Sequence, residues 1–205
     1  SGYGSIGHSN TLAAHYYSAG LDNLGQAVAS VSVRDFEGGA AVDVRELILL
    51  GGGQGETRQL DQYISGMSFD GFESIWSYIV YGDGRVNIRH TVKPHGTMPP
   101  YLPRIGITFV LDGSLSNVQW YGRGPQANYP DRKSGYRLGI WNTTVEDMYE
   151  PYLIPQDYGL RTDNRWVRMT DADGRGVEIS VDEPFNFNAY NFSTENLTKA
   201  VYTYQ

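Results

Sequence analysis

The stretch FESIWSYIVYGDGRVNIRHTV, residues 72–92, decides the fold class of this chain. Residues 72–80 and 86–92 each repeat with a period of two, and Gly82-Asp83-Gly84 lies between them. Successive side chains of a strand point to opposite faces, so such alternation around an Asp-Gly turn is typical of a β-hairpin. The stretch therefore predicts two antiparallel strands joined by a tight turn.

Comparable short runs continue along the chain on both sides of this hairpin. A second hairpin is expected over residues 166–181, around an Asp-Ala-Asp-Gly turn at 171–174. Further strands are expected at residues 27–36, 40–50, 105–111, 115–121 and 136–141, each bounded by Gly, Pro, Asn or Asp. Short strands at regular spacing, without convincing amphipathic helices, favour an all-β sandwich or barrel.

Composition excludes several classes of protein. The 205 residues include no Cys, which excludes disulfide scaffolds, cysteine-ligated metal centres and thiol nucleophiles. Sixteen basic residues against 23 acidic ones give a net charge of −7, which argues against nucleic acid as a partner. No apolar run approaches the ~18 residues of a membrane span, so no membrane partner is expected. The 16 Tyr, 7 Phe and 4 Trp could serve a core or a sugar-binding surface.

No metal or cofactor site is predicted. The four His form no tight cluster with carboxylates, and the glycine run at 51–55 lacks the Lys of a phosphate loop. The turn at 171–174 resembles the start of a calcium loop but lacks its later ligands, so a hairpin turn is favoured. His90 alternates with apolar residues on one strand face. It is either a hydrogen-bonded histidine at the core edge or a proton-transfer residue facing a cavity.

Two polar and aromatic clusters, residues 120–132 and 148–166, contain most of the candidate site residues. The first is either a rigid corner locked by an ion pair or a sugar-facing edge, where aromatic rings stack on sugars and forked polar groups bind hydroxyls. If the corner is structural, Asp131→Ala should cost about 3 kcal/mol by stranding a buried arginine. The carbohydrate-facing candidates are Arg123, Asn128, Tyr129, Asp131, Arg132, Arg161, Trp166 and His90.

These clusters also resemble a known family. Gly-Arg-Gly-Pro-x-x-Asn-Tyr-Pro-Asp-Arg at 122–132 is similar to the small-chain domain of family 2 β-galactosidases, and residues 148–161 resemble its next block. Shorter similarities occur at 102–106, 115–120, 184–187 and 193–198. The resemblance implies a large antiparallel supersandwich similar to galactose mutarotases. It assigns residues 27–205 to this domain, without the family's last strands, and residues 1–26 to an extension packing on it.

The resemblance also implies a role in carbohydrate metabolism. The family's catalytic glutamates lie in a separate (β/α)₈ barrel, so this chain is expected to hold no catalytic residue and to be inactive alone. Its expected partners are the remaining domains or the large subunit of a β-galactosidase and a galactoside sugar, in the cytoplasm or periplasm of a bacterium. Two departures affect the sugar-binding role: Ala127 replaces a Glu of the family, and Tyr158 replaces an Asn.

Two other functions remain open from the sequence. The first is a free-standing carbohydrate-binding module, for which the aromatic content and the polar corner would supply the binding surface. The second is an aldose epimerase-like enzyme that uses His90 or His95 with a carboxylate as its acid and base.

Overall fold

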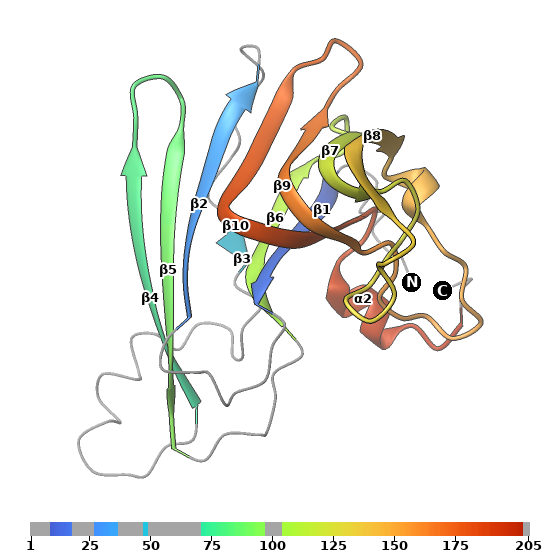
Figure 1. Ribbon diagram of the computed structural model, residues 1–205, viewed down its shortest axis with the longest axis horizontal. Coiled ribbons are helices and arrows are strands. Elements are labelled where there is room, and N and C mark those ends of the chain that lie inside the picture. The colour runs from blue at the N-terminus through green and yellow to red at the C-terminus, as the bar shows by residue number, and fades with distance from the viewer. Residues whose placement is uncertain (1–8, 18–26, 37–46, 49–70, 97–103, 203–205) are drawn as a thin grey trace, which may run out of the picture.

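The computed structural model describes residues 9–17, 27–36, 47–48, 71–96 and 104–202 (Figure 1). These parts of the chain are built almost entirely of antiparallel strands, which confirms the all-β prediction. The strands are β1 Ser9–Tyr17, β2 Ala27–Phe36, β3 Leu47–Ile48, β4 Gly71–Val80, β5 Val86–His95, β6 Ile105–Asp112, β7 Asn117–Gly124, β8 Arg137–Thr144, β9 Arg161–Thr170 and β10 Gly176–Tyr190. The helical turns are η3 Glu146–Met148 and α2 Thr194–Lys199.

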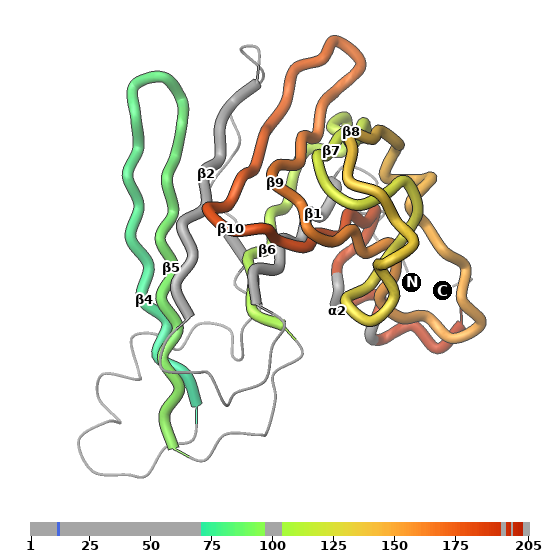
Figure 2. The backbone as a smooth tube through the Cα atoms, viewed as in Figure 1, coloured from blue at the N-terminus to red at the C-terminus, as the bar shows by residue number. Residues whose placement is uncertain are grey.

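The sheet branches at β10, the longest strand described. Strands follow the order β3-β6-β1-β10-β2-β5-β4, while β9, β7 and β8 extend from the other edge of β10. Residues 176–181 of β10 pair with β2, and residues 186–190 pair with β1. The register against β9 shifts between Ser180 and Phe185, where β10 bends (Figures 1 and 2). One strand therefore connects the β4–β5–β2 part of the sheet to the β7–β8–β9 part.

Both hairpins predicted from the sequence are present. β4 and β5 pair in register from Gly71 opposite His95 to Val80 opposite Val86, and Gly84 closes the turn with a φ of 84°. Residues 171–175 join β9 to β10, and the carboxylate of Asp171 accepts hydrogen bonds from the backbone N–H groups of Asp173 and Arg175. Asp171 thus stabilises a hairpin turn, which is the structure predicted from the sequence for residues 171–174.

The main core lies between the two parts of the branched sheet. In the part of the chain described, its buried side chains come mainly from six strands, because the alternating inward positions of each strand converge there. They include Leu12, Ile88, Ile107, Trp120, Val167, Met169, Ile179 and Phe187. A smaller cluster of Tyr158, Tyr190 and Leu197 fixes α2 against the end of β10.

The N-terminal segment contributes to the sheet itself. β1 runs between β6 and β10, and Leu12 is completely buried. The predicted division of the chain at residue 26 stays a prediction. Part of the strand expected at 40–50 lies outside the described residues. Across the described ranges, no helix is long and apolar enough to cross a membrane.

The position of β10 in the core can be tested with two isoleucines. We expect Ile179→Ala on β10, which is 0% exposed, to lower the free energy of unfolding by about 3 kcal/mol through lost burial and a cavity. Ile140→Ala on β8, where the side chain is 62% exposed, should change it by less than about 1 kcal/mol. Urea denaturation of both variants measures this, and equal losses would contradict the assignment.

Candidate functional site

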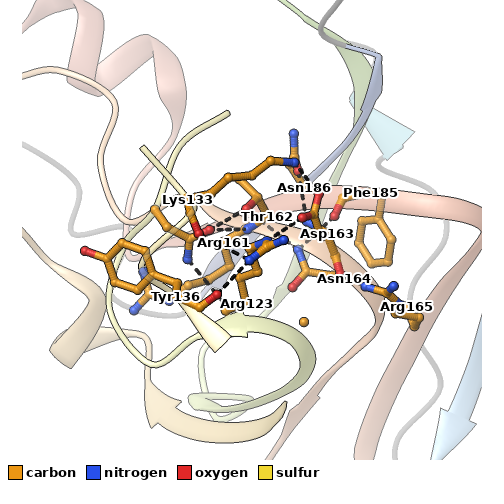
Figure 3. Close-up of polar contacts among 12 residues, drawn as sticks. Arg123, Lys133, Tyr136, Arg161, Thr162, Asp163, Asn164, Arg165, Phe185 and Asn186 are labelled. Carbon is orange, nitrogen blue, oxygen red and sulfur yellow. Dashed lines mark hydrogen bonds and ion pairs between the residues drawn. The ribbon is translucent and has the colours of Figure 1, made fainter. Parts of the chain in front are cut away.

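The candidate site residues of the sequence lie mainly at a corner where β7 ends and β9 begins (Figure 3). Two glycines of the Gly-Arg-Gly-Pro motif allow close packing there. A Cβ on Gly122 would overlap the side chain of Asn164, and a Cβ on Gly124 would lie 2.6 Å from Cδ1 of Trp141. The missing side chains let Asn164 and Trp141 pack directly on the backbone of β7, and Trp141 Nε1 donates to Gly122 O over 3.2 Å.

An ion-pair network locks this corner. Arg123 Nε donates to one carboxylate oxygen of Asp163 at 2.5 Å, and Lys133 Nζ donates to the other at 2.7 Å. Arg123 also donates to the carbonyl of Tyr136 at 2.7 Å, so it ties the loop before β8 to β9. Burial alone would raise the pKa of Asp163, but the hydrogen bonds and charges of Lys133 and Arg123 outweigh it and lower that pKa. Asp163 is therefore a fixed anion.

Asn128 is a second fixed point of the corner. Its side chain is completely buried, and its amide nitrogen donates to the carbonyls of Gln126 and Arg123 at 3.0 and 3.3 Å. Its amide oxygen accepts hydrogen bonds from both the backbone N–H and the hydroxyl of Thr162. The amide therefore links the corner to β9 and is fully used within the protein.

Arg161 is a buried cation at the start of β9. The residue is 5% exposed, its guanidinium lies 5.2 Å from the ring centre of Trp120, and Nη1 donates to Gly159 O at 2.8 Å. Burial lowers the pKa of Arg161 to about 10, an effect that the nearby charge of Glu150 partly offsets. Within the described residues its buried Nε has no hydrogen-bond partner. The buried guanidinium of Arg161 therefore contacts neighbouring residues of the corner, such as Trp120 and Gly159.

The remaining members of the first cluster are less buried. Tyr129 is half-buried, and the guanidinium of Arg132 lies 5.4 Å from its ring centre. Asp131 and Arg132 are both exposed. An ion pair does lock the corner, but its acid is Asp163 rather than Asp131. The premise of the cost expected for Asp131→Ala is therefore not met, because the carboxylate of Asp131 is exposed and no ion pair within the described residues joins it to a buried arginine.

Trp166 and His90 lie apart from the corner. Trp166 is opposite Tyr121 on the outward face of the β7–β9 pair, with the guanidinium of Arg168 4.5 Å from its ring centre. His90 belongs to β5, where its ring stacks on Trp76 at 3.6 Å and its Nε2 lies 3.4 Å from Ser74 Oγ. Burial lowers the pKa of His90 to about 4, so the ring is neutral at neutral pH. Its surroundings are those of the hydrogen-bonded core-edge histidine.

Sequence reasoning missed a groove of about 560 Å³ at the opposite end of β7, β8 and β9. Its lining comes from five separate segments, which is why no local motif marked it. The alternation in β7 was the available signal, since Asn117, Gln119 and Tyr121 point outward while Val118 and Trp120 are buried. The lining residues are Asn117, Val118, Gln119, Asn142, Thr143, Thr144, Asp147, Arg168, Thr170 and Gly174. We call this feature the amide groove.

Neither the corner nor the groove resembles a metal centre. Over the described ranges, no three His, Asp or Glu side chains are grouped closely enough to hold a metal ion. The two partly buried acids at the corner are already engaged, because Asp163 binds two cations and Glu150 accepts a hydrogen bond from the hydroxyl of Tyr152 at 2.6 Å. Asp131 is exposed. The arrangement provides a rigid polar surface.

Comparison with known proteins gives a consistent set of relatives. Residues 8–205 match the family described as "Beta galactosidase small chain". A β-galactosidase of Priestia megaterium is 38% identical over 57% of this chain and 11% of its own length. Those of Halalkalibacterium halodurans and Vibrio cholerae are each 35% identical, over 62% and 61% of this chain and 13% and 11% of their own lengths. The chain thus spans about an eighth or less of these curated relatives.

The role of Asp163 can be tested by its dependence on pH. Asn tolerates the left-handed φ of 55° at this position, so Asp163→Asn removes the charge without straining the backbone. At neutral pH we expect this variant to lose about 2 kcal/mol of unfolding free energy. Folding lowers the pKa of Asp163 below its ordinary value of 3.8. The stabilisation is therefore fully present above pH 3.8, and it is lost as the pH falls through the lower pKa of the folded state.

The measurement is urea denaturation of wild type and Asp163→Asn over a range of pH. Asp131→Asn is the matched control, since that carboxylate is exposed. A gap between wild type and Asp163→Asn that is as large in acid as at neutral pH would count against the ion-pair network.

Proposed function

The chain belongs to the β-galactosidase small-chain family, and from this we propose that it is the small-chain domain of a family 2 enzyme that hydrolyses terminal β-galactosides. The match over residues 8–205 is the observation that carries the proposal. The chain spans only 11–13% of the three relatives named above, each a β-galactosidase. The remaining domains, or a large subunit, are therefore its proposed partners.

We further propose that hydrolysis takes place on another domain. A glycosidase needs two carboxyl groups held across the scissile bond, one of them protonated. At the corner, Asp163 has a lowered pKa and two cationic partners, which suits an anion in a structural ion pair. Asp157 pairs with Arg104, and Glu178 pairs with Arg168 at 2.5 Å. These engagements support a domain that shapes and stabilises the enzyme.

The two departures from the family motif also support a structural role for this chain and hydrolysis on another domain. Ala127 is 5% exposed, so the carboxylate of the family motif is replaced here by a small buried side chain. Tyr158 is 2% exposed, and its ring packs edge-on against Tyr190 at 5.0 Å. Both positions contribute packing in this chain, which favours a structural role for the corner over direct sugar contact. The branched antiparallel sheet is compatible with the proposed mutarotase-like supersandwich.

The proposal predicts that the chain alone does not hydrolyse a chromogenic β-galactoside. The assay needs a preparation free of host β-galactosidase, with heat-inactivated protein as the blank. Adding the polypeptide that carries the remaining domains should give a complex on size-exclusion chromatography and turnover above that of either part. Turnover by the chain alone, or full activity of the other polypeptide without it, would contradict the proposed function.

A further inference from the structure

We propose that the amide groove binds a neutral saccharide. The groove lies at the Asn117 end of β7, and the Gly-Arg-Gly-Pro corner lies at the other end of the same strand. It is therefore distinct from the corner that carries the main family motif at 122–132, although Asn117, Val118 and Gln119 fall within the shorter similarity at 115–120. Its volume of about 560 Å³ falls within the range of small-ligand sites, about 300–1,000 Å³.

The chemistry of the lining suits sugar hydroxyls. Asn117, Gln119 and Asn142 each present an amide, which offers both a hydrogen-bond donor and an acceptor. Threonines 143, 144 and 170 lie beside them. A sugar hydroxyl both donates and accepts, so a wall of amides and hydroxyls can satisfy several hydroxyls at once. An apolar ligand would leave these polar groups unpaired, which is costly.

Several groups of the lining are held in place before any ligand arrives. Asp147 and Thr144 exchange two hydrogen bonds, from the Thr144 hydroxyl to the carboxylate at 2.9 Å and from the Asp147 backbone N–H to the hydroxyl at 3.1 Å. Asn117 Nδ2 donates to Asp171 O at 3.0 Å, which leaves its amide oxygen as an acceptor. Fixed groups lose little conformational entropy on binding, which favours affinity for a weakly bound polar ligand.

Charge selects a neutral ligand over an anionic one. Arg168 Nε binds the Glu178 carboxylate at 2.5 Å, and Arg168 Nη1 lies 3.4 Å from Gln119 Oε1. The guanidinium also stacks on Trp166, with 4.5 Å to its ring centre. Its positive charge is thus matched by Glu178, while Asp147 adds a negative charge to the lining. A phosphate or an acidic sugar would meet no net positive charge here.

This inference rests on the proposed function only in the choice of sugar, because the relatives described above are β-galactosidases. The probes are therefore galactose and lactose, with inorganic phosphate as the anion. Isothermal titration calorimetry on the 205-residue chain measures all three. We expect heat of binding for lactose and none beyond dilution for phosphate.

Asn142→Ala is the decisive variant. Asn142 is exposed on β8, a strand that pairs on one side with β7, so its loss should leave the fold intact, which circular dichroism checks. We expect it to weaken lactose binding by about fivefold, the effect of roughly one lost hydrogen bond. Gln119→Ala should weaken binding similarly. Asn191→Ala, an exposed amide outside the groove, should bind lactose like wild type.

Three results would overturn the inference: no heat with galactose or lactose, unchanged lactose binding in Asn142→Ala, or binding of phosphate in preference to lactose. The titration uses no catalytic domain, so failure of saccharide binding leaves the hydrolysis test of the proposed function unaffected. A chain that binds lactose through Asn142 but forms no complex with the remaining domains would contradict the proposed function alone.

Discussion

Backbone pairing along β10 is the constraint on which the rest of the structure depends. A strand normally has two neighbours, but β10 has three because it changes partner along its length, from β2 at residues 176–181 to β1 at residues 186–190. Along its other edge, β10 pairs with β9 both before and after the register shift between Ser180 and Phe185. The bend lets one strand satisfy its hydrogen bonds in two differently oriented regions, and the main core fills the space between them.

The polar corner is hydrogen-bonded to β10 at this bend. Asn164 Nδ2 donates to the carbonyl of Phe185 on β10 at 2.8 Å and to that of Arg161 at 2.7 Å. Asn186 on β10 accepts a hydrogen bond from the backbone N–H of Asp163 at 3.3 Å. Arg123 of the motif pairs with Asp163, and Gly122 of the motif packs against Asn164, so the motif is joined to the bent strand through these two residues of β9. This explains how a polar, glycine-rich motif can have a structural role.

Local patterns predicted local structure well. The hairpin at 72–92 combines alternation with an Asp-Gly turn, and both signals act between neighbours in the chain. The partners of β10 could not be predicted in the same way, since they come from distant segments. Asp163 was missed as the acid of the ion pair because Arg123 is 40 residues away. The left-handed backbone at this position was not predicted either, because the residue is Asp and not the Gly that usually marks such a conformation. The amide groove was missed for a similar reason, because five segments contribute to it.

The exposed edge of the amide groove has a consequence for producing the protein. Asn142, Thr143 and Thr144 form an Asn-x-Thr sequence, the acceptor pattern for N-linked glycosylation. Asn142 is exposed on β8 and lines the groove, so a glycan attached there in a eukaryotic secretory host would occupy the groove entrance. Expression in bacteria without that pathway keeps the Asn142 side chain unmodified.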